Sequence, residues 1–177
     1  MLVSLLQFLD RALRLLNVAA LGVAAAFIGF LAVVGAADVI GTAFFGAPVP
    51  SALELSEAGL VVIVFMALSF AQQRRAHITV DIFSAKFTGI ARFLSVALAL
   101  LAAMAFFGFL AVRGGVAAWE SVVIDERSEG LARIPLYPGK FALATGCLLA
   151  ALESLRQFVH LLLGRVETEP ADKESVV

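Results

Sequence analysis

The chain alternates between long apolar stretches and short polar segments. Residues 18–38, 53–71, 93–113 and 139–163 are each long and apolar enough to cross a hydrocarbon core of about 30 Å as an α-helix. Within the first stretch, residues 18–37 contain no side chain more polar than glycine. The pattern predicts an all-α membrane protein in which residues 1–163 form a single domain with four transmembrane helices.

The segment before the first apolar stretch has a different pattern. Polar side chains recur at steps of three or four residues: Ser4, Gln7, Arg11 and Arg14. Leucines fill most of the opposite side, so residues 1–17 are predicted to form an amphipathic helix in the membrane interface. A plain extension of the first span into water is the alternative. At the other end of the chain, residues 164–177 are polar and are predicted to be a disordered cytoplasmic tail.

The first and third connections between the apolar stretches both contain prolines that interrupt a helix. The first begins at Asp38 and contains Pro48 and Pro50 but no Lys or Arg, so an irregular outer loop is expected. In the third, residues 116–130 keep apolar side chains at helical spacing, which allows the third span to project outward as a helix. Pro135 and Pro138 then interrupt the helical pattern.

The connection between the second and third stretches is strongly basic. It carries Arg74, Arg75, Lys86 and Arg92. Basic loops stay on the cytoplasmic side of a membrane. With this loop and both tails on one side, that side holds nine Lys and Arg residues and the other side holds four. Both termini are therefore predicted to be cytoplasmic.

Composition agrees with a membrane protein and excludes several functional classes. Hydrophobic residues make up 62% of the chain, charged residues 15%, and the mean hydropathy is +1.00. A net charge of −1 provides no field that would attract nucleic acid. The single cysteine, Cys147, excludes a disulfide framework and a four-cysteine metal site. No glycine-rich phosphate loop, nucleophile elbow or zinc-binding histidine pair occurs, so no catalytic, cofactor-binding or metal-binding residues are predicted.

Glu153 is the most unusual ionisable residue, because it lies well inside the fourth span. A carboxylate at the centre of a bilayer costs roughly 2.5–3.5 kcal/mol, so it must face protein or water. Arg156 follows three residues later and can pair with it on one helix face. Two interpretations stay open: a buried contact with another helix or subunit, and a pair that reaches the cytoplasmic edge. A proton relay is disfavoured, because the first and third spans supply no acids.

The fourth span also carries a ridge of small residues. Ala142, Gly146 and Ala150 follow one another at four-residue steps. Small side chains on one helix face allow a second helix to approach closely. The ridge therefore predicts a tight helix–helix contact.

Two further pairs of charged or titratable residues lie near span ends. Glu54 and Glu57 begin the second span, where helix capping or a subunit contact is favoured over a metal site. His77 and Asp81 are four residues apart in the basic connection. They are expected to form a structural pair or to be solvated, since a metal site would need more ligands.

Three segments in succession resemble one known family: GAPVPSALELSEAGLVVIVFMALSFA, QQRRAHITVDIF and IPLYPGKFALATG. The sequence resembles the small membrane subunit of tripartite ATP-independent periplasmic (TRAP) transporters, the DctQ-like family, over residues 38–163. The most specific part of the likeness is RRAHITVD, at residues 74–81, and Glu54-Leu55 is a second mark.

The resemblance implies a non-catalytic accessory subunit in the bacterial inner membrane, without a cofactor. Its implied partners are a large membrane subunit, which carries the sodium and substrate sites and moves as an elevator, and a periplasmic solute-binding protein that delivers an organic acid. The small subunit would brace the large one within the lipid bilayer and help dock the binding protein.

Candidate residues follow from the patterns and from the resemblance together. The candidate subunit-interface or structural residues are Asp38, Glu54, Glu57, Arg74, Arg75, His77, Asp81, Ala142, Gly146, Ala150, Glu153 and Arg156. The candidate residues for docking the periplasmic protein are Trp119, Glu126, Arg127, Glu129, Arg133 and Tyr137.

Two other functions are alternatives. A membrane anchor subunit of a haem- or quinone-linked oxidoreductase would need histidines within the spans, but His77 lies in a loop and His160 at a span end. A small transporter acting alone would need broken spans or polar residues near the midplane. The first and third spans have neither.

Overall fold

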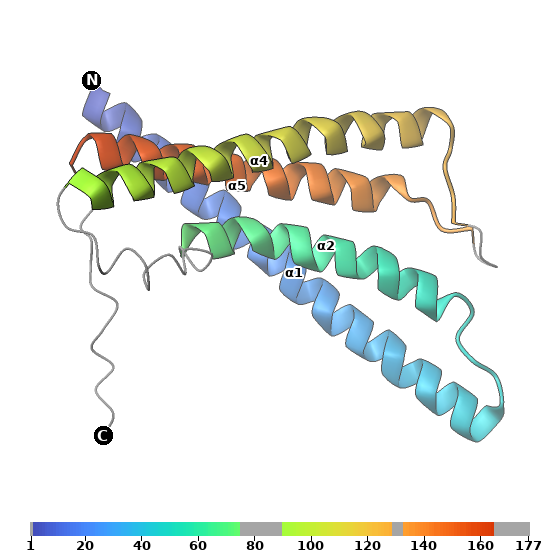
Figure 1. Cartoon of the computed structure of the whole chain (residues 1–177). Helices are drawn as coiled ribbons and strands as arrows, with labels where there is room; N and C mark the ends of the chain where they lie inside the picture. The colour runs from blue at the N-terminus through green and yellow to red at the C-terminus, as the bar shows by residue number, and fades with distance from the viewer. Residues whose placement is uncertain (1, 75–89, 129–132, 165–177) are drawn as a thin grey trace, which may run out of the picture.

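The computed structural model describes residues 2–74, 90–128 and 133–164, with side chains from residue 7 onward. It contains four helices in these residues: α1 (Leu2–Phe45), α2 (Ala52–Gln73), α4 (Ile90–Val123) and α5 (Tyr137–Leu162) (Figure 1). Each is long and apolar enough to cross a membrane. The described part of the chain therefore confirms an all-α architecture with four candidate spans.

Helix α1 differs from the prediction at both ends of its span. It is one continuous helix of 44 residues, so the predicted division between an interfacial helix and a first span near residue 17 was wrong. The leucine-rich start contains no glycine or proline that would interrupt a helix. The prediction that the helix ends near Asp38 was also wrong, because α1 continues to Phe45 and the first proline is Pro48.

Asp38 holds the connection from α1 to α2 instead of ending the helix. Its Oδ1 atom accepts a hydrogen bond from the backbone N–H of Val49, at 2.8 Å. The N–H of Ala47 donates to the carbonyl oxygen of Gly41 at 3.1 Å, and Gly46 takes a positive φ of 62°. These contacts fold the connection back over the end of α1.

The other helices lie close to their predicted positions. α2 begins and ends within two residues of the predicted span. α4 is 34 residues long and continues past Gly114 and Gly115 to Val123, which confirms that the third span extends as a helix. Pro138 stands in the first turn of α5, where a missing N–H removes no helical hydrogen bond.

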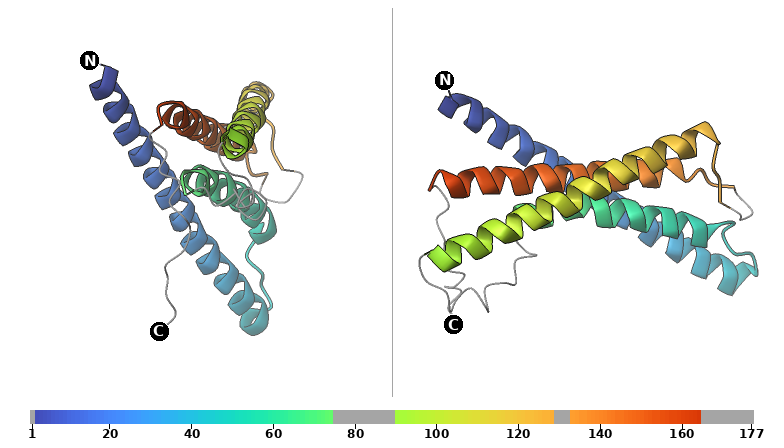
Figure 2. Two further views of the ribbon diagram at one scale, coloured as in Figure 1. Left: turned by 60° about the vertical axis from the view of Figure 1, so that its left-hand side comes forward. Right: turned by 45° about the horizontal axis from the view of Figure 1, so that its top comes forward.

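Helix α5 is the central element of the bundle. It packs against α4, α2 and, less extensively, α1, while α1 packs mainly against α2. α1 crosses the bundle obliquely and its first turns diverge from the other helices (Figures 1 and 2). We call the end where α1 begins and α5 finishes the N-terminal end of the bundle. The opposite end, with the α1–α2 and α4–α5 connections, is the far end.

The distribution of side chains is the reverse of that in a soluble protein. Fully buried positions hold small or polar residues such as Ala118, Ala150 and Glu153, whereas Leu98 is 70% exposed and Phe44 is 80% exposed. Hydrocarbon chains solvate leucine as well as a protein interior does, so close packing and polar contacts hold membrane helices together. This chain follows that rule, with an apolar exterior and a close-packed interior of small and polar residues.

Candidate functional site

Glu153 is the centre of a polar cluster at the N-terminal end of the bundle. It is fully buried, with 0% of its surface exposed. Arg156, one turn later on α5, donates from Nη2 to Oε1 of Glu153 at 2.6 Å and from Nε to both carboxylate oxygens at 3.1 Å. The two residues therefore pair within the chain and on the same helix.

Two more helices contribute to the cluster. Asn17 of α1 donates from Nδ2 to Oε2 of Glu153 at 3.3 Å. Gln157 of α5 donates from Nε2 to Oε1 of Glu153 at 3.1 Å and to the backbone carbonyl of Gln72 on α2 at 2.8 Å. Gln72 in turn donates to the hydroxyl of Ser154 at 3.0 Å. The cluster thus joins α1, α2 and α5 through buried side chains.

Asp10 extends the cluster toward the start of α1. Its Oδ1 atom lies 3.5 Å from Nη1 of Arg156 and both its carboxylate oxygens lie 3.1 Å from Nε2 of His160. Arg156 is therefore shared between a buried carboxylate on its own helix and a half-buried one on α1. The arrangement satisfies the charge of Glu153, which is the condition for keeping a carboxylate inside a membrane helix bundle.

The ridge of small residues on α5 makes the predicted close contact, and its partner is α2. Ala142 and Ala150 are buried. A Cβ atom added at Gly146 would lie 2.0 Å from the backbone oxygen of Phe65 on α2. Only glycine allows the two backbones to come this close.

At the far end of the bundle, polar contacts hold the α4–α5 connection against α2. The hydroxyl of Ser128 donates to Oε2 of Glu54 at 2.7 Å and accepts from the N–H of Ile134 at 3.0 Å. The N–H of Ser128 donates to the carbonyl of Ile134 at 2.8 Å. Glu126 forms an ion pair with Lys140 near the start of α5. Through its contact with Ser128, Glu54 thus holds the α4–α5 connection against the start of α2.

The contact with Lys140 lowers the pKa of Glu126. The pKa of the Glu126 carboxyl lies below its usual value of 4.5, chiefly because the Lys140 ammonium group donates a hydrogen bond to the carboxylate. A lowered folded-state pKa means that the contact stabilises the fold fully above pH 4.5 and loses this effect as the pH falls through the lowered pKa.

Several predicted docking residues lie on the surface of the far end. Trp119 is 67% exposed on α4. Arg127 and Asp125 form an ion pair at 2.8 Å, with 50% and 65% of their side chains exposed, and Arg133 is exposed with φ of 45°. Tyr137 is the first residue of α5. Trp119, Arg127 and Arg133 are exposed, whereas Tyr137 is half-buried. All four belong to one connection and the helix ends that it joins.

The remaining predicted residues lie apart from the polar cluster and from the far-end contacts, or outside the residues that the structure describes. Glu57 is exposed, and the residues that the structure describes hold no group of three His, Cys, Asp or Glu side chains suited to a metal ion. Arg74 follows the last residue of α2, with its guanidinium 5.3 Å from the centre of the Phe70 ring. Four candidates lie outside the described residues, as does the polar tail: Arg75, His77, Asp81 and Glu129.

The comparison with protein families shows which family contains this chain, with its polar cluster and its far-end contacts. The family model described as "Tripartite ATP-independent periplasmic transporters, DctQ component" matches residues 31–164, which is most of the chain. The chain belongs to the DctQ family. A search of curated proteins found no significant match.

Membership in the DctQ family makes this chain a non-catalytic component of a TRAP transporter in the inner membrane. The haem- or quinone-linked oxidoreductase alternative is thereby set aside. Because these transporters are tripartite, a DctQ component implies two further components. The match includes Glu153 and Arg156 but begins after Asp10 and Asn17, so the α1 half of the polar cluster lies outside the matched residues.

Sequence reasoning found only part of the polar cluster. It named Glu153 and Arg156 but not Asn17, Gln72 or Asp10 as their neighbours. One feature of the sequence does indicate these neighbours. Asp10, Arg14 and Asn17 are spaced at steps of four and three, so they continue the polar stripe of α1 as far as the start of the apolar span at Val18. A polar stripe that reaches into a span indicates a face directed at protein instead of lipid.

Proposed function

We propose that this DctQ chain is an accessory subunit that braces the large membrane subunit of its transporter and helps dock the periplasmic solute-binding protein during ion-coupled uptake of an organic acid. The family match over residues 31–164 carries the proposal. The N-terminal end and the far end would then lie in the cytoplasm and the periplasm, as the excess of basic residues favours.

The polar groups of the described helices support a bracing role over a transport path. The buried carboxylate of Glu153 is held by Arg156 and by amides from two helices, which fixes these helices relative to one another. In contrast, α4 holds no ionisable residue from Phe93 to Val112. A transporter acting alone would need broken helices or polar groups at the midplane.

The apolar exterior offers surface to a large membrane partner. α1 packs mainly against α2, and α4 packs mainly against α5, so each leaves a long free face. Val33 on α1 is 69% exposed and Leu98 on α4 is 70% exposed. Lipid covers apolar residues of this kind in an isolated subunit, and a partner helix can replace lipid at little cost.

The far end suits contact with a water-soluble protein. Its exposed groups include the Trp119 indole and the Arg127–Asp125 ion pair, and the half-buried phenol of Tyr137 lies at the start of α5. Tryptophan, tyrosine and arginine dominate binding energy at protein interfaces. The contacts of Glu54 with Ser128 and of Glu126 with Lys140 hold this surface in one conformation, which lowers the entropy cost of docking.

Site-directed photo-crosslinking tests both contacts in the assembled transporter. A photoreactive residue at Val33 or Leu98 is expected to crosslink to the large membrane subunit, because both positions face out of the bundle. The same residue at Trp119 is expected to crosslink to the solute-binding protein. Arg92 is the matched control. It lies in the first turn of α4, which begins at the N-terminal end of the bundle (Figure 1), and it should give no crosslink to that protein.

Two results would contradict the proposal. One is the absence of crosslinks to the large subunit from both α1 and α4. The other is a crosslink to the binding protein from Arg92 and not from Trp119, which would also reverse the proposed orientation in the membrane.

A further inference from the structure

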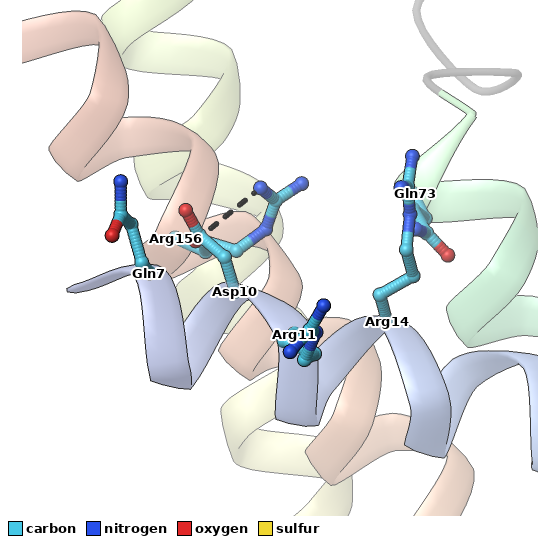
Figure 3. A pocket seen from close by; sticks show the side chains of 6 residues that line it. All are labelled: Gln7, Asp10, Arg11, Arg14, Gln73 and Arg156. Atoms are coloured by element: carbon cyan, nitrogen blue, oxygen red, sulfur yellow. Dashed lines mark hydrogen bonds and ion pairs between the residues drawn. The ribbon is translucent and has the colours of Figure 1, made fainter. Parts of the chain in front are cut away.

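A groove at the N-terminal end of the bundle lies between α1, α2 and α5. Its volume is about 410 Å³ and its lining residues are Gln7, Asp10, Arg11, Arg14, Gln73 and Arg156. Figure 3 shows the side chains of α1 along one side, Arg156 behind Asp10, and Gln73 facing Arg14 from the end of α2. The groove adjoins the polar cluster through Asp10 and Arg156 only.

The groove has an excess of positive charge. Arg156 is already paired with Glu153 and Asp10. Arg11 and Arg14 make no ion pair with any residue that the structure describes, although they line the same space. Guanidinium groups are donors only and bind phosphate oxygens with two parallel hydrogen bonds. The amide groups of Gln7 and Gln73 supply further donors.

The depth of the groove matches the headgroup layer of a membrane. Arg14 stands four residues before Val18, where the uncharged part of α1 begins, which corresponds to about 6 Å along the helix. The headgroup layer is roughly 5–8 Å thick on each side of the hydrocarbon core. With the uncharged part of α1 in the hydrocarbon core, this spacing would place Arg14 at the level of the lipid phosphates.

The surroundings of the groove favour an amphiphilic ligand. The outward side of α1 beside it is apolar: Phe8 is 68% exposed, Leu15 is 64% exposed and Leu16 is 52% exposed. A free phosphate ion would gain nothing from these residues. A lipid could place its headgroup among the arginines and its acyl chains along α1.

We propose that this groove binds the phosphate group of an anionic phospholipid, with Arg11 and Arg14 as its principal ligands. Bound lipid would then fill the angle between the diverging start of α1 and the ends of α2 and α5 (Figures 1 and 3). This inference goes beyond the role in the transporter and does not depend on it.

Native mass spectrometry of the full chain tests the proposal. The chain is transferred from nanodiscs that contain phosphatidylglycerol and phosphatidylcholine, and bound lipids are counted. We expect retained phosphatidylglycerol, with affinity reduced about 30-fold in the double variant Arg11→Gln/Arg14→Gln, since each arginine near a membrane surface contributes about fivefold. The double variant Arg92→Gln/Arg113→Gln removes the same charge outside the groove and should retain lipid as the parent chain does.

Three outcomes would overturn the proposal. The first is equal retention of phosphatidylcholine and phosphatidylglycerol. The second is an equal loss in both double variants, which would indicate a general surface charge effect. The third is retention of inorganic phosphate by the parent chain with no retained phosphatidylglycerol, which would assign the groove to the free ion. A thermal unfolding scan of each variant establishes that the fold is intact.

Discussion

Replacing Glu153 with leucine is expected to lower the free energy of unfolding by about 3 kcal/mol or more, since breaking a buried ion pair costs about 3–5 kcal/mol. The substitution leaves Arg156 without its nearest partner and leaves the amide donors of Asn17 and Gln157 without their acceptor. Arg156 keeps 27% of its side chain exposed and stays close to Asp10, which places the loss toward the lower end of that range.

The double variant Glu153→Leu/Arg156→Leu is the control that separates the effect of an unpaired buried charge from the effect of the changed packing. Removing both charges of a buried pair is often close to neutral, so the double variant is expected to lose less stability than Glu153→Leu alone. Unfolding in mixed detergent micelles, followed by circular dichroism, measures both. If Glu153→Leu alone proved neutral, the carboxylate would reach solvent instead of being held in the cluster.

Replacing Gly146 with alanine is expected to lower the free energy of unfolding by about 1–3 kcal/mol, the usual cost of overpacking a close contact. The added methyl group would lie 2.0 Å from the backbone oxygen of Phe65, so a helix and not merely a side chain has to move. The loss should appear in the same unfolding measurement, because the contact joins α5 to α2.

Gly108 provides a matched control for this substitution. It is a glycine in the middle of α4, and a Cβ atom added there meets nothing within 4 Å. Gly108→Ala is expected to be neutral or to stabilise the chain by up to about 1 kcal/mol through helix propensity. Equal stability of Gly146→Ala and Gly108→Ala would contradict the close approach of α2 and α5.

The spans of this protein could be predicted because hydropathy is a local property. α2 and α5 begin and end within two residues of the positions that the apolar stretches indicate. The end of α1 could not be predicted in the same way. The contact of Asp38 with the N–H of Val49 reaches across 11 residues, so an acid that marks the end of an apolar stretch need not mark the end of a helix.

The polar cluster shows a similar division between local and distant contacts. The Glu153–Arg156 pair lies within one helical turn, and its spacing alone predicts it. The contact of Glu153 with Asn17 spans 136 residues and depends on where α1 crosses α5. Sequence spacing carries no information on that crossing. The far-end contact of Glu54 with Ser128, across 74 residues, was missed for the same reason.

The small-residue ridge was predicted as a surface for close approach, but its partner was not specified. Ala142, Gly146 and Ala150 could equally have met a helix of another subunit. In the structure α2 of the same chain covers Gly146, so this ridge is part of the internal packing. The outward faces of α1 and α4 carry exposed apolar residues, and the hydropathy pattern could not distinguish a partner-facing surface from a lipid-facing one.

Reconstituted transport tests the accessory role most directly. The chain is placed in proteoliposomes alone and together with the large membrane subunit, and solute-loaded binding protein is added to both under a sodium gradient. The solute is the one that co-purifies with the binding protein, supplied in radiolabelled form. We predict uptake only when both membrane subunits are present. Uptake by proteoliposomes that contain this chain without the large subunit would contradict the accessory role.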